Sequence, residues 1–225
     1  MCLRRRPPGQ LLVNTSTLPS DQTLNAACTA KRQQILDGAA TLFLHNGYEG
    51  TSMSQVAREA GVSKGTLYNY FDCKAQLFSA LIEAVAETKL RNVYERIHSD
   101  DLDCATTLQR VAEAMIRTLL QPDSMMLYRI IVAEARKFPL LADIFWQRAF
   151  GVSISTLADW IANRAARGEL VVDDPVFAAE QFFMLCQTRI VQRHRFELPV
   201  DKSDAAIKTV ARITSESFMK LNGAH

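Results

Sequence analysis

The residues best suited to chemistry are a cluster of hydrogen-bond donors in residues 63–70, SKGTLYNY. Ammonium, hydroxyl and amide groups at this density can donate to phosphate oxygens and to the edges of bases. Lys64 suits guanine acceptors or phosphate, and Thr66 can bond a base or touch a thymine methyl group. Gly65 lacks a Cβ, so its backbone can approach a partner closely. This cluster predicts a contact with nucleic acid, and its other members are Ser63, Tyr68, Asn69 and Tyr70.

Two short helices are needed to present these donors. Apolar residues recur at helical spacing between positions 53 and 60, and Gly61 then supplies a turn. Ser63 stands where an N-cap belongs, at the start of the second helix. Residues 52–71 therefore predict a helix-turn-helix motif, which places its second helix in the major groove of double-stranded DNA.

Further donors flank this motif. Thr51 and Ser52, at the start of the first motif helix, could grip the other strand. Lys74 begins the next helix, where its ammonium and the free backbone amides predict an anion site aided by the helix dipole.

The charge of the chain is nearly balanced. The 225 residues carry a net charge of +2, and residues 31–75 contain five Lys and Arg against four Asp and Glu. A single copy therefore brings little positive charge to DNA, whereas pairing of two copies would double the contacts.

Enzyme chemistry has no recognisable motif in this sequence. The four histidines lack HExxH or comparable spacing, and neither a Gly-rich phosphate loop nor GxSxG occurs. We expect no catalysis, no metal and no cofactor. Five scattered cysteines fit a reducing cytoplasm, and no apolar run approaches the roughly 20 residues that span a bilayer.

Every segment after residue 31 has helical periodicity, so the predicted class is all-α. Residues 1–30, rich in proline and polar side chains, predict a disordered arm, in which Arg4, Arg5 and Arg6 either touch DNA or have no role. Residues 31–75 predict a DNA-binding domain, and residues 76–225 predict an effector-binding and dimerisation domain. The helices expected after the motif cover about 72–98, 104–120, 123–137, 140–167 with a kink or break at Gly151, 176–195 and 203–221.

Residues 35–77 resemble the N-terminal signature of the TetR/AcrR transcriptional regulators. The likeness is strongest in VSKGTLYNYF followed by Lys74. Residues 128–149 are similar to the AefR-like branch of the C-terminal domains. The resemblance implies about nine helices, a homodimer formed by the last two, and a ligand pocket between the long fourth helix and its neighbours. It also implies an effector that releases the protein from DNA.

Two positions depart from the family pattern. Cys73 replaces the usual serine, and Ala75 replaces the usual acidic residue. Asp72 could supply the lost cap. A cysteine at a helix N-terminus can be reactive, or it can be a small residue tolerated at a cap, and both interpretations stay open.

Candidates for effector binding are polar or aromatic residues within the apolar helices. Their alternatives are plain core packing and, for Arg129 and Glu134, a structural ion pair. A mostly apolar lining, with Met115 and Met126 as adaptable members, favours a hydrophobic or aromatic small molecule. The candidates are Arg129, Glu134, Trp146, Phe150, Phe183 and Gln187.

The sequence thus predicts a cytoplasmic repressor that binds a palindromic operator as a homodimer and is released by a small molecule. The last two helices are apolar around much of their circumference, which favours burial against both the chain's own core and a second copy. Two alternatives stay open, an activator of the same family and a helical protein-interaction module.

Overall fold

The computed structural model describes residues 21–97 and 102–224, with side chains at 28–85 and 102–224. The described residues are helical, without strands beyond one isolated bridge between Leu170 and Gly223, which confirms the all-α prediction. The helices are α1 (Asp21–Asn46), α2 (Met53–Glu59), α3 (Lys64–Tyr70), α4 (Lys74–Ile97), α5 (Cys104–Leu119), α6 (Pro122–Glu134), α7 (Pro139–Phe145), η1 (Trp146–Gly151), α8 (Val152–Ala166), α9 (Pro175–Cys186), α10 (Ile190–Arg195) and α11 (Asp204–Asn222).

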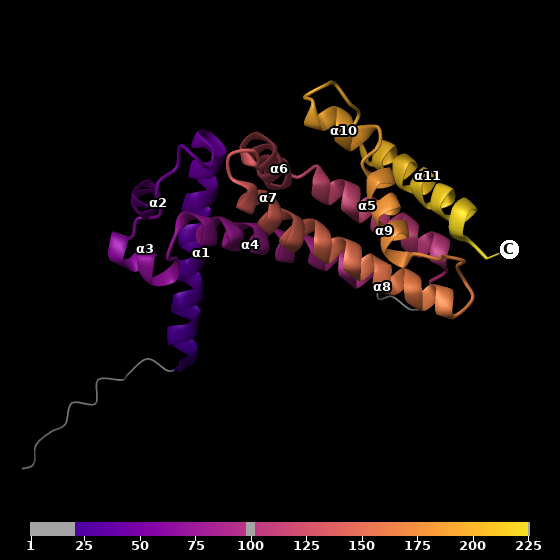
Figure 1. Cartoon of the computed structure of the whole chain (residues 1–225), viewed down its shortest axis with the longest axis horizontal. Coiled ribbons are helices and arrows are strands. Elements are labelled where there is room, and N and C mark those ends of the chain that lie inside the picture. Colours follow the sequence, from indigo (N-terminus) through magenta and orange to yellow (C-terminus); the bar gives the residue numbers. More distant parts are fainter. Residues whose placement is uncertain (1–20, 98–101, 225) are drawn as a thin grey trace, which may run out of the picture.

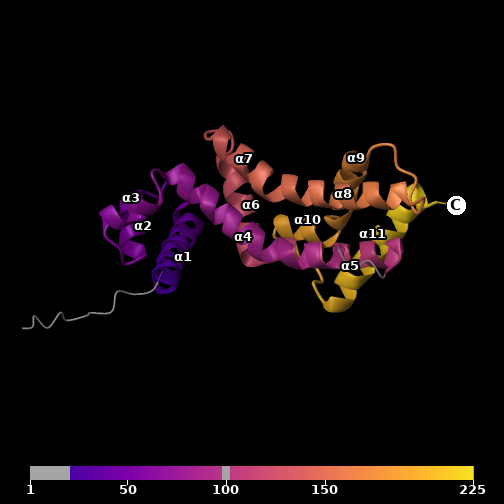
Figure 2. The ribbon, with the colours of Figure 1, turned by 90° about the horizontal axis from the view of Figure 1, so that it is seen from below.

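The molecule is elongated, with an N-terminal unit (α1–α3) at one end and a body (α5–α11) at the other. Helix α4 leaves the N-terminal unit and runs into the body, as both ribbon views show (Figures 1 and 2). In the body α4 contacts α5, α6, α7, η1 and α8. One helix therefore joins the two ends mechanically.

Two hydrophobic cores hold these parts together. The first joins α1–α4 to α6 and α7, and it includes Phe43, Leu67, Phe78, Ile130 and Leu141. The N-terminal helices share this core with α6 and α7, because three such short helices bury too little surface alone. The second core joins α5 to α8–α11.

The predicted arm is wrong for residues 21–30, which form the first ten residues of α1. This stretch lacks Gly and Pro and contains several alanines, so helix propensity extends α1 ahead of its apolar stripe. The rest of the predicted arm, including Arg4, Arg5 and Arg6, lies outside the described residues.

The helix predicted for residues 176–195 is two helices, α9 and α10. Arg189 has a φ of 58° and a ψ of −73°, and the Ile190 N–H donates to the Thr188 carbonyl at 2.7 Å, so a γ-turn interrupts the helical hydrogen bonds after Cys186. The kink foreseen at Gly151 takes the form of the π-helical turn η1, which joins α7 and α8 without a break. With α7, η1 and α8 counted as one rod, the described part of the chain has ten helices.

Candidate nucleic-acid interface and ligand pocket

The helix-turn-helix forms because each of its short helices is capped at its first residue. Ser52 and Gln55 make a capping box on α2, in which each side chain binds the other residue's backbone N–H. Gly61 turns the chain with φ of 61°, a conformation that glycine adopts without strain. Ser63 caps α3, where its Oγ accepts the Thr66 N–H at 3.0 Å. The predicted N-cap at Ser63 is confirmed.

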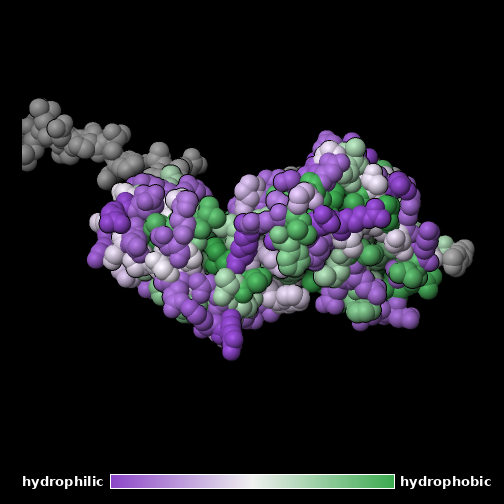
Figure 3. Space-filling view, turned by 90° about the horizontal axis from the view of Figure 1, so that it is seen from above, coloured by the Kyte–Doolittle hydropathy of each residue, from purple (hydrophilic) through white to green (hydrophobic). Residues whose placement is uncertain are grey.

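The outer face of α3 carries donors that the protein does not use itself. Lys64, Tyr68 and Asn69 are exposed, and none of them hydrogen-bonds to another described residue. Leu67 on the opposite face is buried and anchors the helix to the first core. Seen from above, the N-terminal unit is largely hydrophilic on its surface (Figure 3). A helix held from behind with unpaired donors in front can receive a polar, anionic partner.

Gly65 also lies on this exposed side of α3. A Cβ built there would meet only the Ser63 Oγ, at 3.8 Å. The fold itself therefore does not require glycine at this position. A close approach from outside gives a reason for the missing side chain.

Several other predicted donors are already occupied within the protein. Thr66 Oγ1 lies 2.8 Å from Ser63 Oγ, and the Ser52 Oγ donates to Gln55 Oε1 at 2.7 Å. Tyr70 is half-buried against Phe71, and a hydrogen bond with the Cys28 thiol raises its pKa. The side chains in these contacts therefore stabilise the motif itself, in addition to any contact that they offer to a partner.

The structure contradicts the predicted DNA contact of Thr51. Its side chain is 1% exposed, and its Oγ1 donates to the carbonyls of Gly47 at 2.8 Å and Leu42 at 3.2 Å. The hydroxyl closes the turn between α1 and α2. It therefore faces the interior and has no free donor for a phosphate.

The ammonium of Lys74 is hydrogen-bonded within the protein, and its predicted anion site stays a prediction. Its Nζ donates to the carbonyls of Tyr48 at 2.6 Å and Thr51 at 2.8 Å, with the Glu49 carbonyl at 3.4 Å. It also lies 4.4 Å from the centre of the Tyr48 ring. Burial lowers the pKa of Lys74, and nearby carboxylates oppose that effect. The ammonium thus braces the turn between α1 and α2 against α4.

The cap proposed for α4 takes another form. The Asp72 backbone N–H donates to Gln76 Oε1 at 2.6 Å, so a side chain one turn later closes the helix start. Cys73 is exposed there, and its redox role stays a prediction.

Two cations near the motif were missed in the sequence. Arg32 of α1 packs over the Phe71 ring at 5.6 Å, beside the end of α3. Arg58, on the exposed side of α2, has no ion-pair partner among the described residues. A side-chain period on α2 could have pointed to Arg58, because it falls opposite the buried Val56 and Ala57.

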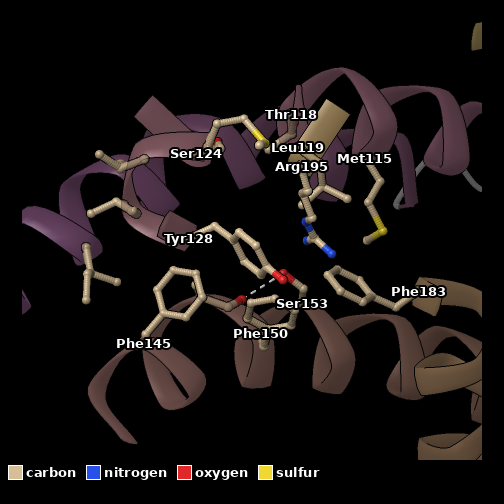
Figure 4. Close-up of a pocket in the computed structure, with 15 residues that line it drawn as sticks. Met115, Thr118, Leu119, Ser124, Tyr128, Phe145, Phe150, Ser153, Phe183 and Arg195 are labelled. Carbon is tan, nitrogen blue, oxygen red and sulfur yellow. Dashed lines mark hydrogen bonds between the residues drawn. The ribbon is translucent and has the colours of Figure 1, made fainter. Parts of the chain in front are cut away.

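A pocket lies where the two cores meet. Its cavity volume is about 80 Å³. Helices α4–α10 and the turn η1 contribute side chains to its wall, and Figure 4 shows these side chains. The lining residues are Ile82, Val85, Met115, Thr118, Leu119, Ser124, Met125, Leu127, Tyr128, Phe145, Ala149, Phe150, Ser153, Phe183 and Arg195.

Aromatic rings form one side of this pocket. Phe150 packs edge-on against Phe183 at 4.9 Å and against Phe145 at 5.3 Å between ring centres. Trp146 stacks on Phe150 at 5.6 Å but is half exposed and lies outside the lining. The π-helical turn determines where these rings lie, because it shifts the side chains between α7 and α8.

Only Phe150, Phe183 and the adaptable Met115 of the predicted effector residues line the pocket. Arg129 is exposed and pairs with Glu197 at 2.8 Å, so the suggested pair with Glu134 does not form. Met126 is buried in the first core instead.

Glu134 and Gln187 have other contacts. Glu134 Oε1 accepts the Glu49 N–H at 3.3 Å, which ties the end of α6 to the N-terminal unit. Gln187 is buried behind the pocket, and its Oε1 accepts from Arg195 Nη1 at 2.5 Å. Glu134 and Gln187 therefore hold neighbouring segments in place, and neither lines the pocket.

The sequence prediction missed Tyr128, Ser153 and Arg195 in the lining. Arg195 is the last residue of α10. The direction of its side chain depends on the turn at Arg189 before α10, for which the sequence has no signal. The described residues contain no cluster suited to a metal ion, and no helix among them could cross a membrane.

Two family models match the chain. The model of bacterial regulatory proteins of the tetR family covers residues 35–81. The model of the C-terminal domain of AefR-like transcriptional repressors covers residues 106–221, which is more than half of the chain.

Individual proteins similar to the chain are also regulators, in agreement with the family models. The chain is 32% identical to the HTH-type transcriptional repressor KstR2 of Rhodococcus jostii over 100 residues, 44% of this chain and 46% of that protein. It is 33% identical to the fatty acid metabolism regulator protein of Bacillus subtilis over 82 residues, 36% of this chain and 40% of that protein. The chain spans about half the length of the curated relatives it matches.

Solved structures extend the likeness to nearly the whole fold. The flavonoid-responsive regulator FrrA superposes with a TM-score of 0.74 at 30% identity, over 87% of this chain and 98% of that one. A TetR-family regulator from Mesorhizobium loti superposes with a TM-score of 0.77 at 26% identity, over the same shares. The chain belongs to the TetR family of regulatory proteins and carries an AefR-like C-terminal domain.

Proposed function

We propose that the protein is a transcriptional repressor that binds a palindromic operator as a homodimer and is released by a small-molecule effector. The observation that carries the proposal is the outer face of α3, where Lys64, Tyr68 and Asn69 have no partner within the described chain. The names of the relatives support it, since KstR2 is a transcriptional repressor. An activator would use the same DNA contacts and differ only in where its operator lies.

In this proposal α3 enters the major groove. The Lys64 ammonium reaches guanine acceptors or phosphate, and Asn69 can pair with a base edge. Tyr68, 49% exposed, offers its hydroxyl to a phosphate. Exposed Arg58 on α2 adds a positive charge at the flank. Gly65 lets the backbone approach without a clash.

A second copy of the chain would cover the outer face of α9. Phe177 and Met184, seven residues apart and so on one face of the helix, are 55% and 56% exposed. The opposite face, with Phe182 and Cys186, is fully buried in the second core. Helix α11 beside it carries exposed Leu221. The predicted dimer surface, residues 176–195 and 203–221, comprises these two helices and α10.

The pocket is suited to control the two DNA-binding ends. Its wall takes Ile82 and Val85 from α4, the helix that carries the N-terminal unit, and Phe183 from α9. A ligand between them would change the tilt of α4 relative to the dimer surface. FrrA, a relative of the same fold, is named as responsive to flavonoids.

Release from DNA would follow from spacing. Operator half-sites must match the distance between two α3 helices, about 34–36 Å or a multiple. An effector that prefers a dimer with another spacing lowers DNA affinity by its differential affinity for that state.

The test is binding of the purified full chain to DNA from upstream of its own gene, measured by fluorescence anisotropy at several salt concentrations. We expect salt-dependent binding that is at least about a thousandfold tighter than binding to random DNA of equal length. Lys64→Ala should reduce this ratio, while Lys202→Ala, at an exposed lysine in the segment between α10 and α11, should not. Equal affinity of the wild type for both DNAs, without salt dependence, would favour the protein-interaction module instead.

A further inference from the structure

Arg195 places a cation in the wall of the apolar pocket without an acid to balance it. Its guanidinium carbon lies 4.0 Å from the centre of the Tyr128 ring. It forms no ion pair with any described acidic side chain, and burial lowers its pKa. The neighbouring Arg193 is exposed, and its guanidinium donates to the Pro199 carbonyl. Arg195 alone of this pair faces the pocket.

One edge of the Arg195 guanidinium has no hydrogen-bond partner among the described residues. Nη1 donates to Gln187 Oε1 at 2.5 Å, which fixes the plane of the group. Nε is buried and has no hydrogen-bond partner, and Nη2 donates to no described residue. The Nε–H and Nη2–H bonds point the same way, which matches the two oxygens of a carboxylate. A buried donor left unpaired is costly, so an occupant that satisfies it is favoured.

The rest of the pocket would hold an apolar group. Figure 4 shows the Arg195 guanidinium reaching into the space between Tyr128, Ser153 and Phe183. Phe150 adds a further ring to this wall. The Ser153 Oγ donates to the Ala149 carbonyl at 2.9 Å, so it can still accept but has no proton to give. The rest of the lining is mostly apolar, and Thr118, Ser124 and the Tyr128 hydroxyl are its other polar groups.

We propose that the pocket binds monocarboxylates with an apolar or aromatic body, and that the carboxylate pairs with Nε and Nη2 of Arg195. The inference rests on the proposed function, in which this pocket binds the effector. Gln187 is then a positioning residue, because it holds the guanidinium plane from behind without touching the ligand.

The experiment is isothermal titration of the full chain with octanoate and 4-phenylbutanoate, each compared with its neutral amide of equal length. At least one acid should bind about tenfold or more tightly than its amide, since only the acid accepts two charge-assisted hydrogen bonds. Equal affinity of each acid and its amide overturns the proposal. So does the absence of binding by both acids at millimolar concentration.

Variants assign the effect to Arg195. Arg195→Met should lose the preference for acid over amide, and Arg195→Lys, which keeps the charge but lacks the paired donors, should retain only part of it. Arg193→Met removes the same charge from the same helix and should behave as the wild type. Unfolding curves identify variants that fail to fold. If Arg195→Met does not fold, the acid preference of Arg195→Lys decides the test. Wild-type acid preference in a folded Arg195→Met or Arg195→Lys variant overturns the proposal.

The outcome is separable from that of the proposed function. Titration measures ligand binding without DNA, and operator release is measured independently by anisotropy. Acids that bind through Arg195 but leave operator affinity unchanged would support this inference and count against effector control. Neutral ligands that release DNA would support effector control and count against this inference.

Discussion

Among single residues, Lys64 and Lys74 carry the same charge within one motif but have different surroundings. Lys64 is exposed without a partner, whereas three backbone carbonyls of residues 48–51 surround the Lys74 ammonium. Lys74→Ala should lower the free energy of unfolding by roughly 1.5–3 kcal/mol, because the buried carbonyls lose a charged donor. Urea unfolding measures this change.

Lys64→Ala is the control for this measurement. It should change stability by less than about 0.5 kcal/mol, as an exposed substitution does. An equal loss of stability in both variants, or none in Lys74→Ala, would contradict the bracing role of Lys74.

Gly65→Ala separates stability from DNA binding. Alanine fits, since the nearest atom to its Cβ is 3.8 Å away, and it should stabilise α3 by up to about 0.5–1 kcal/mol. The added methyl group lies on the outer face and should weaken operator binding. Thermal unfolding measures the expected gain in stability, and fluorescence anisotropy on the same sample measures the expected loss of operator affinity. Undiminished operator affinity would show that nothing approaches the Gly65 backbone.

Single-residue roles were predictable only where they depend on local sequence. The Ser63 cap follows from residues three positions apart, and the structure confirms it. The burial of Thr51 depends on the carbonyl of Leu42 in α1, and Lys74 finds its partners 23–26 positions away. Spacing shows which donors exist. It does not show which of them the fold already uses.

Among the helices, periodicity and proline positions predicted most segments. Pro122, Pro139 and Pro175 each stand at the start of a helix, as expected of residues without a backbone N–H. The break between α9 and α10 escaped prediction because Arg189 takes a conformation usually left to glycine. That break turns α10 so that Arg195 reaches the pocket, and the most informative pocket residue was therefore missed.

The end of α6 is a clamp on the N-terminal unit. Glu134 accepts the Glu49 N–H, and Lys137 pairs with the Glu49 carboxylate at 2.5 Å. Lys137 lowers the pKa of Glu49 through a hydrogen bond. Glu134→Ala should speed hydrogen exchange of the Glu49 amide by a few fold to about tenfold, the value of one hydrogen bond. Mass spectrometry of the peptide that covers residues 47–52 reports it.

Arg136→Ala is the matched control for this clamp. Arg136 is exposed on the same segment and has no partner among the described residues. Its loss should leave exchange unchanged, and amides of α5 and α11 should be unaffected in both variants. Faster exchange throughout the chain in Glu134→Ala would indicate global destabilisation and contradict a local clamp.

For the whole molecule, the small net charge raises the question of whether DNA binding requires dimerisation. The chain has a net charge of +2, and few cations surround α3, so one copy has little electrostatic hold on DNA. Two copies with matched half-sites would combine their affinities through a high effective concentration. Dimerisation and DNA binding should therefore fail together.

Charge placed on α9 tests this coupling. Phe177→Asp combined with Met184→Glu puts two carboxylates on the exposed apolar face of the proposed dimer surface, where burial without partners would cost several kcal/mol. We expect a monomer of unchanged helicity by sedimentation velocity and circular dichroism. Affinity for a full palindromic site should fall by at least about a hundredfold, while affinity for a half-site should stay near the wild-type value.

Val132→Asp is the control for this surface. Val132 is 64% exposed on α6, away from α9 and α11, so a carboxylate there should stay in water and leave the oligomeric state unchanged. If the α9 variant remained a dimer, another surface would have to join the two copies, and the predicted role of the last two helices would be wrong. If it were monomeric and still bound the full site as the wild type does, positive charge outside the described residues would have to supply the affinity, and the first candidates would be Arg4, Arg5 and Arg6.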